Sequence, residues 1–204
     1  MNSIEKKIIA IGGGGFTHQL DTSLDQFVID QSKKTKNKIG FLATASKDDE
    51  NKINLFYKRY KNTRSELSHF NLTSALDGFS EWIINKDIIY IGGGNTVFML
   101  NIWKKNKLES IFKNAYEKGI ILSGVSAGAV CWFDWILSDS AGPGFNPLRG
   151  INLISGSCTP HSSNFERINQ FESDIKNNKL PQGIAIDDGV AVVFVDGKPT
   201  EVYS

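Results

Sequence analysis

Cysteine and histidine are both scarce in this sequence, which has two cysteines and three histidines among its 204 residues. Cys131 and Cys158 are too few for a disulfide framework, and they do not form the C-x-x-C pair of a redox or zinc motif. No two histidines or cysteines stand at the spacing of metal ligands. We therefore expect a protein of the reducing cytoplasm that holds no metal.

Long apolar runs are absent too, and the opposite charges nearly cancel. The first apolar run is too short for the core of a signal peptide, and no run is long enough to span a bilayer. Lys and Arg number 23 against 22 for Asp and Glu, so the net charge of +1 creates no overall field that favours nucleic acid or an anionic membrane. Small molecules are the expected partners.

The composition is otherwise that of an ordinary globular protein. Hydrophobic residues make up 40% and charged residues 22% of the sequence, which argues against disordered and fibrous classes. No internal repeat, low-complexity tract or linker divides it. We expect one domain over residues 1–204, with a sizeable core.

Apolar runs of strand length alternate with segments of helical periodicity along the sequence. Strands are predicted at 7–11, 38–44, 66–72, 87–91, 120–122, 151–154 and 183–186, with a β-hairpin at 190–203. Helices are predicted at 21–34, 49–60, 75–84, 96–105, 108–118, 127–137 and 164–176. This alternation indicates a mostly parallel sheet covered by helices on both faces, with the terminal hairpin antiparallel at one edge.

Ser126 lies at the centre of Gly124-Val-Ser-Ala-Gly128, between a predicted strand and a predicted helix. A serine exposed at so tight a corner needs small neighbours, and the amide after it points toward an oxyanion. Because a Gly-x-Ser-x-Gly pattern alone is common, its partners must decide whether the serine is a nucleophile.

A serine nucleophile needs a base, and three histidines are available. His69 lies on a predicted strand and is expected to be structural, whereas His18 follows the first glycine loop and either lines the site or is exposed. His161 lies in a polar loop between a predicted strand and a predicted helix, where a side chain can face a cleft. His161 is therefore the candidate base.

Three carboxylates are candidates for the acid that orients this base. Asp139 is preferred because it follows the predicted helix, in a loop free to return to the sheet edge. Asp134 falls within that helix, and Glu166 is a further option. For each of them the alternative is a surface charge or a helix cap.

Two further glycine loops follow predicted strands, at the sheet edge where ligands gather. Gly92-Gly-Gly-Asn-Thr96 can bring backbone amides to a reacting oxygen, with the Ala127 amide as the second donor; alternatively, Asn95 or Thr96 caps the next helix. The Gly12–Gly15 loop lacks a Gly-x-Gly-x-x-Gly pattern, and no Gly-Lys-Ser/Thr follows it. We therefore expect no nucleotide cofactor.

Taken together, these motifs resemble those of the peptidase E (α-aspartyl dipeptidase) family of serine peptidases, peptidase family S51, and more distantly cyanophycinase. The matching segments follow in the order Gly92–Thr96, Gly124–Ala129 with Cys131–Phe133, and Gly156–His161 followed by Glu166-Arg167. The resemblance implies a three-layer αβα fold of the class I glutamine-amidotransferase type.

The resemblance also implies roles for individual residues. Ser126 would be the nucleophile and His161 the base, and Asp139 looks like the matching position of the acid, although some family members use a glutamate. Gly93 and Ala127 would supply the amides of the oxyanion hole.

On the substrate side, Arg167 looks like the family arginine that pairs with an acidic side chain, a task suited to a guanidinium. Asn95 and Thr96 are expected to bind substrate. The implied activity is hydrolysis of short peptides, above all dipeptides with an N-terminal aspartate, by a monomer or homodimer without a cofactor. The alternatives are another serine hydrolase, either a cyanophycinase-like exopeptidase or an esterase, and a non-catalytic module that binds an acidic peptide or amino acid.

Overall fold

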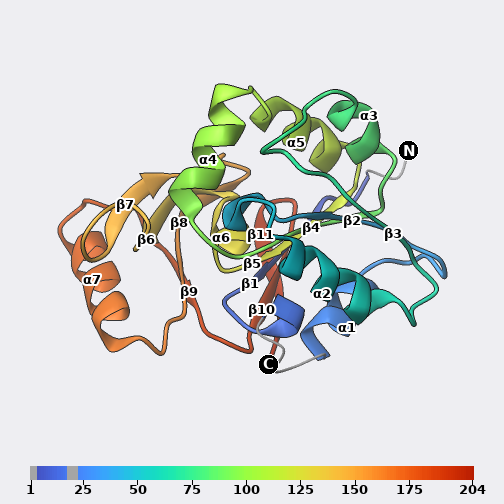
Figure 1. Cartoon of the computed structure of the whole chain (residues 1–204). Helices are drawn as coiled ribbons and strands as arrows, with labels where there is room; N and C mark the ends of the chain where they lie inside the picture. The colour runs from blue at the N-terminus through green and yellow to red at the C-terminus, as the bar shows by residue number, and fades with distance from the viewer. Residues whose placement is uncertain (1–3, 18–22) are drawn as a thin grey trace.

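The computed structural model describes residues 4–17 and 23–204 of the chain (Figure 1). Seven strands of this described part form one sheet in the order β11-β10-β1-β5-β4-β2-β3. The five strands from β1 to β3 in that order run parallel, whereas β10 and β11 are antiparallel at one edge. The strands are β1 (Lys7–Ile11), β2 (Lys38–Leu42), β3 (Glu66–His69), β4 (Ile88–Ile91), β5 (Ile121–Val125), β10 (Ala191–Val195) and β11 (Lys198–Tyr203).

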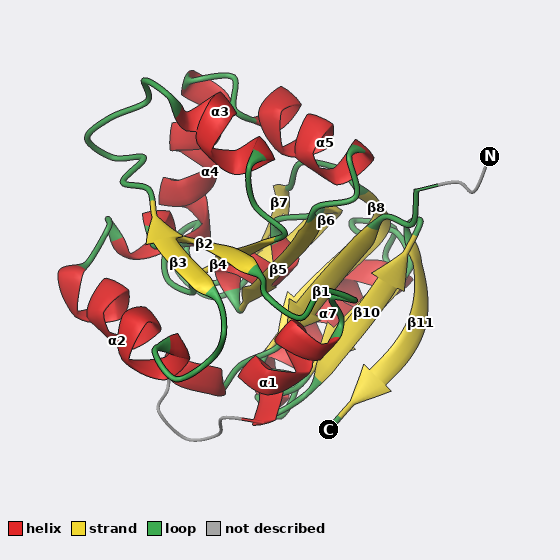
Figure 2. Cartoon of the chain, turned by 90° about the vertical axis from the view of Figure 1, so that its right-hand side faces the viewer, coloured by secondary structure: helices red, strands yellow, loops and turns green. Residues whose placement is uncertain are grey.

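Helices cover both faces of this sheet, as Figure 2 shows. Side chains alternate along a strand, so Ile9 and Ile11 of β1 pack with helices α1 and α2, while Ile8 and Ala10 pack with α3, α4 and α5. The mostly parallel, helix-covered sheet and the terminal hairpin are as predicted. The helices are α1 (Ser23–Asp30), α2 (Glu50–Tyr60), α3 (Phe79–Ile84), α4 (Thr96–Lys105), α5 (Glu109–Glu117), α6 (Ala127–Val130) and α7 (Phe165–Lys176).

A second, four-stranded sheet of order β7-β6-β8-β9 was not predicted. It packs through Phe133, Ile136 and Cys158 into the same core as α3, α4 and α5, and α7 follows β8 on its other side (Figure 1). Within it β6, β8 and β9 run parallel. Its strands are β6 (Phe133–Ser138), β7 (Asn146–Arg149), β8 (Ile154–Pro160) and β9 (Gly183–Ile186).

The helix predicted at 127–137 is wrong, because α6 ends at Val130 and the chain continues as β6. The apolar run from Cys131 to Leu137 suits a buried helix or a buried strand equally well, and its pairing with β7 and β8 decides for the strand. The strand predicted at 151–154 is displaced to β8, so His161 directly follows a strand end.

No helix in the described ranges is long and apolar enough to cross a membrane.

Candidate active site

Ser126 lies at the corner between β5 and α6, with φ 54° and ψ −113°. This conformation is strained for a residue other than glycine. The corner also leaves no room for side chains on either side of the serine: a Cβ at Gly124 would lie 2.3 Å from the Gly128 carbonyl oxygen, and one at Gly128 would lie 2.2 Å from the carbonyl oxygen of Ile91. The Ser126 amide donates to the carbonyl oxygen of Ile11 at 2.9 Å. The corner is therefore held against two neighbouring strands.

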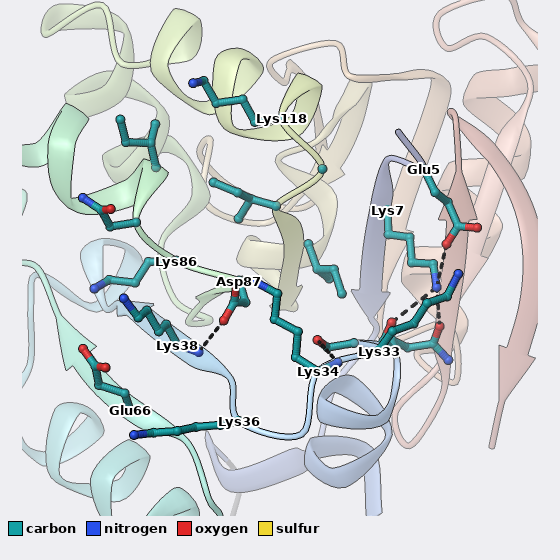
Figure 3. Close-up of a pocket in the computed structure, with 17 residues that line it drawn as sticks. Glu5, Lys7, Lys33, Lys34, Lys36, Lys38, Glu66, Lys86, Asp87 and Lys118 are labelled. Carbon is teal, nitrogen blue, oxygen red and sulfur yellow. Dashed lines mark hydrogen bonds and ion pairs between the residues drawn. The ribbon is translucent and has the colours of Figure 1, made fainter. Parts of the chain in front are cut away.

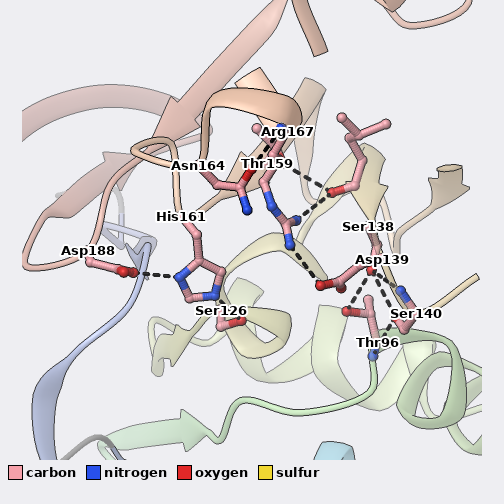
Figure 4. Close-up of polar contacts among 11 residues, drawn as sticks. Thr96, Ser126, Ser138, Asp139, Ser140, Thr159, His161, Asn164, Arg167 and Asp188 are labelled. Carbon is pink, nitrogen blue, oxygen red and sulfur yellow. Dashed lines mark hydrogen bonds and ion pairs between the residues drawn. The ribbon is translucent and has the colours of Figure 1, made fainter. Parts of the chain in front are cut away.

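His161 and an aspartate stand in line with this serine (Figure 4). The Asp188 carboxylate can only accept, so Nδ1–H of His161 donates to its Oδ1 at 2.5 Å. Nε2 then carries the lone pair and accepts from the Ser126 hydroxyl at 2.9 Å. These contacts have the geometry of a nucleophile, a base and the acid that orients the base.

The acid in this arrangement is not the predicted one. Asp139 follows strand β6 rather than a helix, and its Oδ2 accepts from Nη2 of Arg167 at 2.9 Å. Asp134 lies on β6 and pairs with Arg149 on the neighbouring strand β7, and Glu166 is exposed on the first turn of α7. The prediction that Asp139 lies against His161 is therefore corrected by the geometry.

Asp188 is the residue that the sequence reasoning missed. It follows β9, whose carboxyl end lies beside that of β8, which leads into His161. The sequence holds one signal that could have found it, since Asp187-Asp188-Gly189 directly follows the predicted strand at 183–186, at the sheet edge where ligands gather.

The first glycine loop holds this acid. Gly13 forms an isolated parallel bridge with Asp188, and the Gly189 amide donates to the Gly13 carbonyl at 2.9 Å. A Cβ at Gly13 would lie 1.9 Å from Oδ1 of Asp188 and 2.9 Å from Cε1 of His161. The loop therefore has no side chain where the acid and the base meet.

The two predicted oxyanion donors both lie next to Ser126. A Cβ at Gly93 would be 3.3 Å from Cβ of Ser126, and its loop is fixed by the Asn95 amide, which donates to the carbonyl of Ala45 at 2.7 Å. Ala127 is the first residue of α6, where backbone amides have no partner within the helix. Both amides are thus near the position that a tetrahedral oxyanion would occupy.

Of the remaining predicted residues, some line the cavity beside Ser126 and others lie elsewhere. The Asn95 side chain accepts from the Phe98 amide at 2.8 Å and caps α4, as the alternative interpretation expected. Asn95 does not line the cavity beside Ser126 that is described in the next paragraph. Thr96 does line it. His69 hydrogen-bonds the Tyr57 hydroxyl at 2.8 Å, away from Ser126, and His18 lies outside the described residues.

A cavity of about 260 Å³ opens beside Ser126. Four of its lining residues carry titratable or charged groups: Lys52, Asp139, His161 and Arg167. The other lining residues are small, polar or aliphatic: Thr17, Gly93, Gly94, Thr96, Ser126, Val130, Ser138 and Pro160.

Arg167 is buried at one wall of this cavity. Besides Asp139, its guanidinium contacts the Leu137 carbonyl at 3.5 Å and stacks 4.5 Å from the ring centre of Phe145. Its buried Nε finds no hydrogen-bond partner in the described part of the chain. Burial lowers the pKa of Arg167 and the Asp139 charge opposes this shift, and an arginine stays protonated at neutral pH.

A hydroxyl network connects this wall to the oxyanion loop (Figure 4). Ser138 and Ser140 hydroxyls are 2.7 Å apart, and the Ser140 hydroxyl accepts from the Thr96 amide at 3.1 Å. Asp139 lies between these two serines in the chain. The network therefore fixes Asp139 and the start of α4 relative to each other.

A larger cavity, of about 680 Å³, lies at the opposite edge of the sheet, where β1, β2, β4 and β5 begin (Figure 3). The described residues that line it include no histidine and no nucleophile–base pair. Its seven lysines include several just after the carboxyl ends of α1, α3 and α5, where cations complement the helix dipole. They are Lys7, Lys33, Lys34, Lys36, Lys38, Lys86 and Lys118. The cavity at Ser126 is therefore the candidate active site.

Comparison with known proteins gives matches along most of the chain. The model of peptidase family S51 matches residues 8–202. The uncharacterized peptidase YgaJ of Bacillus subtilis is 40% identical over 205 positions, which cover 98% of this chain and 87% of YgaJ. Peptidase E of Nostoc is 24% identical over 126 positions, which cover 61% of this chain and 52% of that protein.

Solved structures share the fold at low sequence identity. A Listeria monocytogenes protein that carries the provisional name peptidase E superposes with a TM-score of 0.72 at 17% identity, covering 96% of this chain and 97% of its own. A peptidase from an acI-B1 actinobacterium gives a TM-score of 0.67 at 18% identity, covering 94% and 84%. These similarities confirm the predicted α/β fold, with mostly parallel strands covered by helices.

Proposed function

This chain belongs to peptidase family S51 and is a serine peptidase, and on that premise we propose that Ser126, His161 and Asp188 are its catalytic triad and that it cleaves dipeptides with an N-terminal aspartate. The observation that carries the triad is the unbroken chain of contacts from Oγ through the imidazole to the carboxylate, at 2.9 and 2.5 Å.

Acylation follows from these contacts. Nε2 of His161 takes the hydroxyl proton as Oγ of Ser126 attacks the scissile carbonyl carbon, and Asp188 stabilises the imidazolium that forms. The negative charge moves to the carbonyl oxygen, to which the amides of Gly93 and Ala127, both next to Ser126, would donate. One such donor contributes about 2.7–4 kcal/mol to the stability of the transition state.

Deacylation uses the same base. When the tetrahedral intermediate collapses, the imidazolium of His161 gives its proton to the leaving nitrogen, and the C–N bond breaks. The aspartyl group remains as an ester on Ser126. A water molecule, deprotonated by His161, then attacks this ester, and the serine hydroxyl regains a proton as the acid is released.

Asp139 and Arg167 support the proposed preference for aspartate. An N-terminal aspartyl residue carries an α-ammonium group and a side-chain carboxylate close together. The cavity wall presents the complementary pair, a carboxylate and a guanidinium 2.9 Å apart. The Asp139 side chain is exposed enough to accept an ammonium group as well, and Arg167 keeps an unsatisfied N–H at Nε.

The test compares release of leucine from Asp-Leu, Asn-Leu and Leu-Leu by the wild-type protein and by Ser126→Ala. We expect wild-type cleavage of Asp-Leu at least about tenfold faster than of Asn-Leu, and a loss of about 10³-fold or more in Ser126→Ala. The matched control is Ser123→Ala on the same strand, whose buried hydroxyl makes no hydrogen bond in the described chain and whose loss should leave turnover intact.

Other results would select an alternative. An unchanged rate in Ser126→Ala would refute the nucleophile. Equal cleavage of all three dipeptides, or cleavage of esters alone, would favour a different serine hydrolase. Thermal stabilisation by Asp-Leu without turnover would favour a binding module.

A further inference from the structure

Lys52 is a charge in the active-site cavity that the proposed mechanism does not use. It lies on the first turn of α2, is half-buried, and lines the cavity with Ser126. Its ammonium group donates to the Gly93 carbonyl at 3.2 Å. Within the described ranges no carboxylate lies within 4 Å of it. A partly desolvated cation without a counter-charge is costly, and an anionic group of a ligand would offset that cost.

The position of Lys52 indicates which part of a substrate it meets. Helices α2 and α7 lie on opposite sides of the corner between β5 and α6 (Figure 1). Lys52 on α2 contacts the Gly93 carbonyl, whereas Arg167 on α7 contacts Asp139. The N-terminal residue of the substrate is placed against Arg167 and Asp139. The residue on the other side of the scissile carbonyl, which leaves first, therefore extends toward Lys52.

We propose that Lys52 binds the free C-terminal carboxylate of the leaving residue and so restricts the enzyme to dipeptides; this inference rests on the proposed function. A dipeptide with N-terminal aspartate has three charged groups at neutral pH: one ammonium and two carboxylates. Among its described lining residues the cavity has one carboxylate, Asp139, and two fixed cations, Arg167 and Lys52. Each charge of the substrate thus has an opposite charge in the site.

The length of the peptide substrate determines whether its terminal carboxylate lies within reach of Lys52. Each added residue moves the terminal carboxylate by up to about 3.5 Å along an extended chain. A hydrogen bond to an ammonium group requires about 2.7–3.2 Å. One additional residue therefore takes the carboxylate out of reach of Lys52, and a neutral peptide group takes its place beside the cation.

A purely structural role for Lys52 predicts a different pattern. If the ammonium group only holds the Gly93 carbonyl, its loss disturbs the oxyanion loop and lowers kcat for every substrate alike. If it binds the terminal carboxylate, its loss raises KM for substrates with that group and changes the ratio between substrates with and without it.

The experiment measures kcat and KM for Asp-Leu and for its C-terminal amide, which lacks only the terminal charge. The wild-type protein should prefer the acid by about tenfold or more in kcat/KM. Lys52→Met, which keeps an unbranched apolar stem, should bring this ratio close to one, chiefly through KM. Lys52→Arg should restore part of the preference. Lys58→Met, on the exposed part of the same helix, is the matched control and should behave as wild type.

Three results would overturn the inference. The first is a wild-type protein that cleaves both substrates without preference. The second is an equal loss of kcat for acid and amide in Lys52→Met, which would make Lys52 a positioning residue for the oxyanion loop. The third is cleavage of neither substrate by the wild-type protein, which would refute the proposed function itself, and the inference with it.

Discussion

Gly13→Ala should disable catalysis without unfolding the protein, because its new methyl group would occupy the place where the acid meets the base. The added Cβ would lie 1.9 Å from Oδ1 of Asp188. Since real Cβ contacts below 3.0 Å essentially do not occur, Oδ1 must retreat by about 1 Å or more. Starting from 2.5 Å, such a movement away from His161 takes the bond beyond the limit of about 3.2 Å. The Asp188 side chain is 61% exposed and can rotate into solvent, so the fold should survive.

The expected loss is that of removing the triad acid, about 10²–10⁴-fold in kcat, or about 2.7–5.4 kcal/mol of activation free energy. Because water reaches Asp188 and partly replaces its effect, we expect the lower half of this range. The assay is kcat for Asp-Leu, together with a thermal unfolding curve that should stay within about 2 °C of wild type.

A double-mutant cycle tests the reasoning behind this prediction. If Gly13→Ala acts through Asp188, the variant with both Gly13→Ala and Asp188→Ala should be no slower than Asp188→Ala alone. Wild-type kcat in Gly13→Ala would refute the argument, and so would two losses that simply multiply in the double variant.

Four other substitutions test separate parts of the structure. Asp188→Asn should lower kcat about 10²-fold or more with little change in KM, because an amide permits the wrong histidine tautomer, whereas Asp139→Asn should act mainly on KM for Asp-Leu. Ser163→Ala removes the hydroxyl that, with the Ser163 amide, holds the pKa of Asp187 below its usual range. A carboxyl group whose pKa is lowered in the folded protein stabilises the fold at pH values above its ordinary pKa near 4, and this contribution is lost as the pH falls through the folded pKa. The Tm of Ser163→Ala should therefore lie about 2 °C below that of wild type at pH 7, and this difference should shrink below about pH 4. Phe112→Ala should lower the free energy of unfolding in urea by about 3–5 kcal/mol, because the ring is fully buried against Trp103.

The candidate residues that the structure brings together around Ser126 lie in short segments. Ser126 needs glycines at fixed offsets because the backbone of its corner excludes side chains, so the requirement is visible within five residues. The position of Gly93 beside Ser126 depends likewise on a local glycine loop after a strand, whereas His161, expected in a loop between a strand and a helix, directly follows β8. The larger sheet was predictable for the same reason, since the apolar strands alternate with periodic helices.

The parts that were missed depend on contacts between distant segments. The run from Cys131 to Leu137 has no periodicity that separates strand from helix, and only pairing with β7 and β8 decides it. Because of this error, Asp139 was expected in a loop after a helix, whereas it follows strand β6. Asp188 is 27 residues from His161 in the chain, and the parallel pairing of β8 with β9 brings the two together. Proximity in sequence to Ser126 was therefore a poor guide to the acid.

The role of the Gly12–Gly15 loop likewise depends on a contact with a distant segment. Its glycines were noticed and set aside, because a nucleotide site would need further residues that are absent. The need for glycine at position 13 follows from the position of Asp188 after β9, because a side chain at Gly13 would clash where Asp188 approaches His161. Likewise, nothing in the helical pattern of α2 distinguishes Lys52 from its exposed neighbours until Gly93 lies beside it.

The central claim, that Ser126 is a nucleophile activated by His161, is tested most directly by covalent labelling with a serine-directed phosphonate followed by peptide mass spectrometry. We predict one adduct, on the peptide that contains Ser126. Labelling should be absent in Ser126→Ala and slowed about 10²-fold or more in His161→Ala. Labelling at another residue, or none in a wild-type protein that cleaves Asp-Leu, would contradict the account.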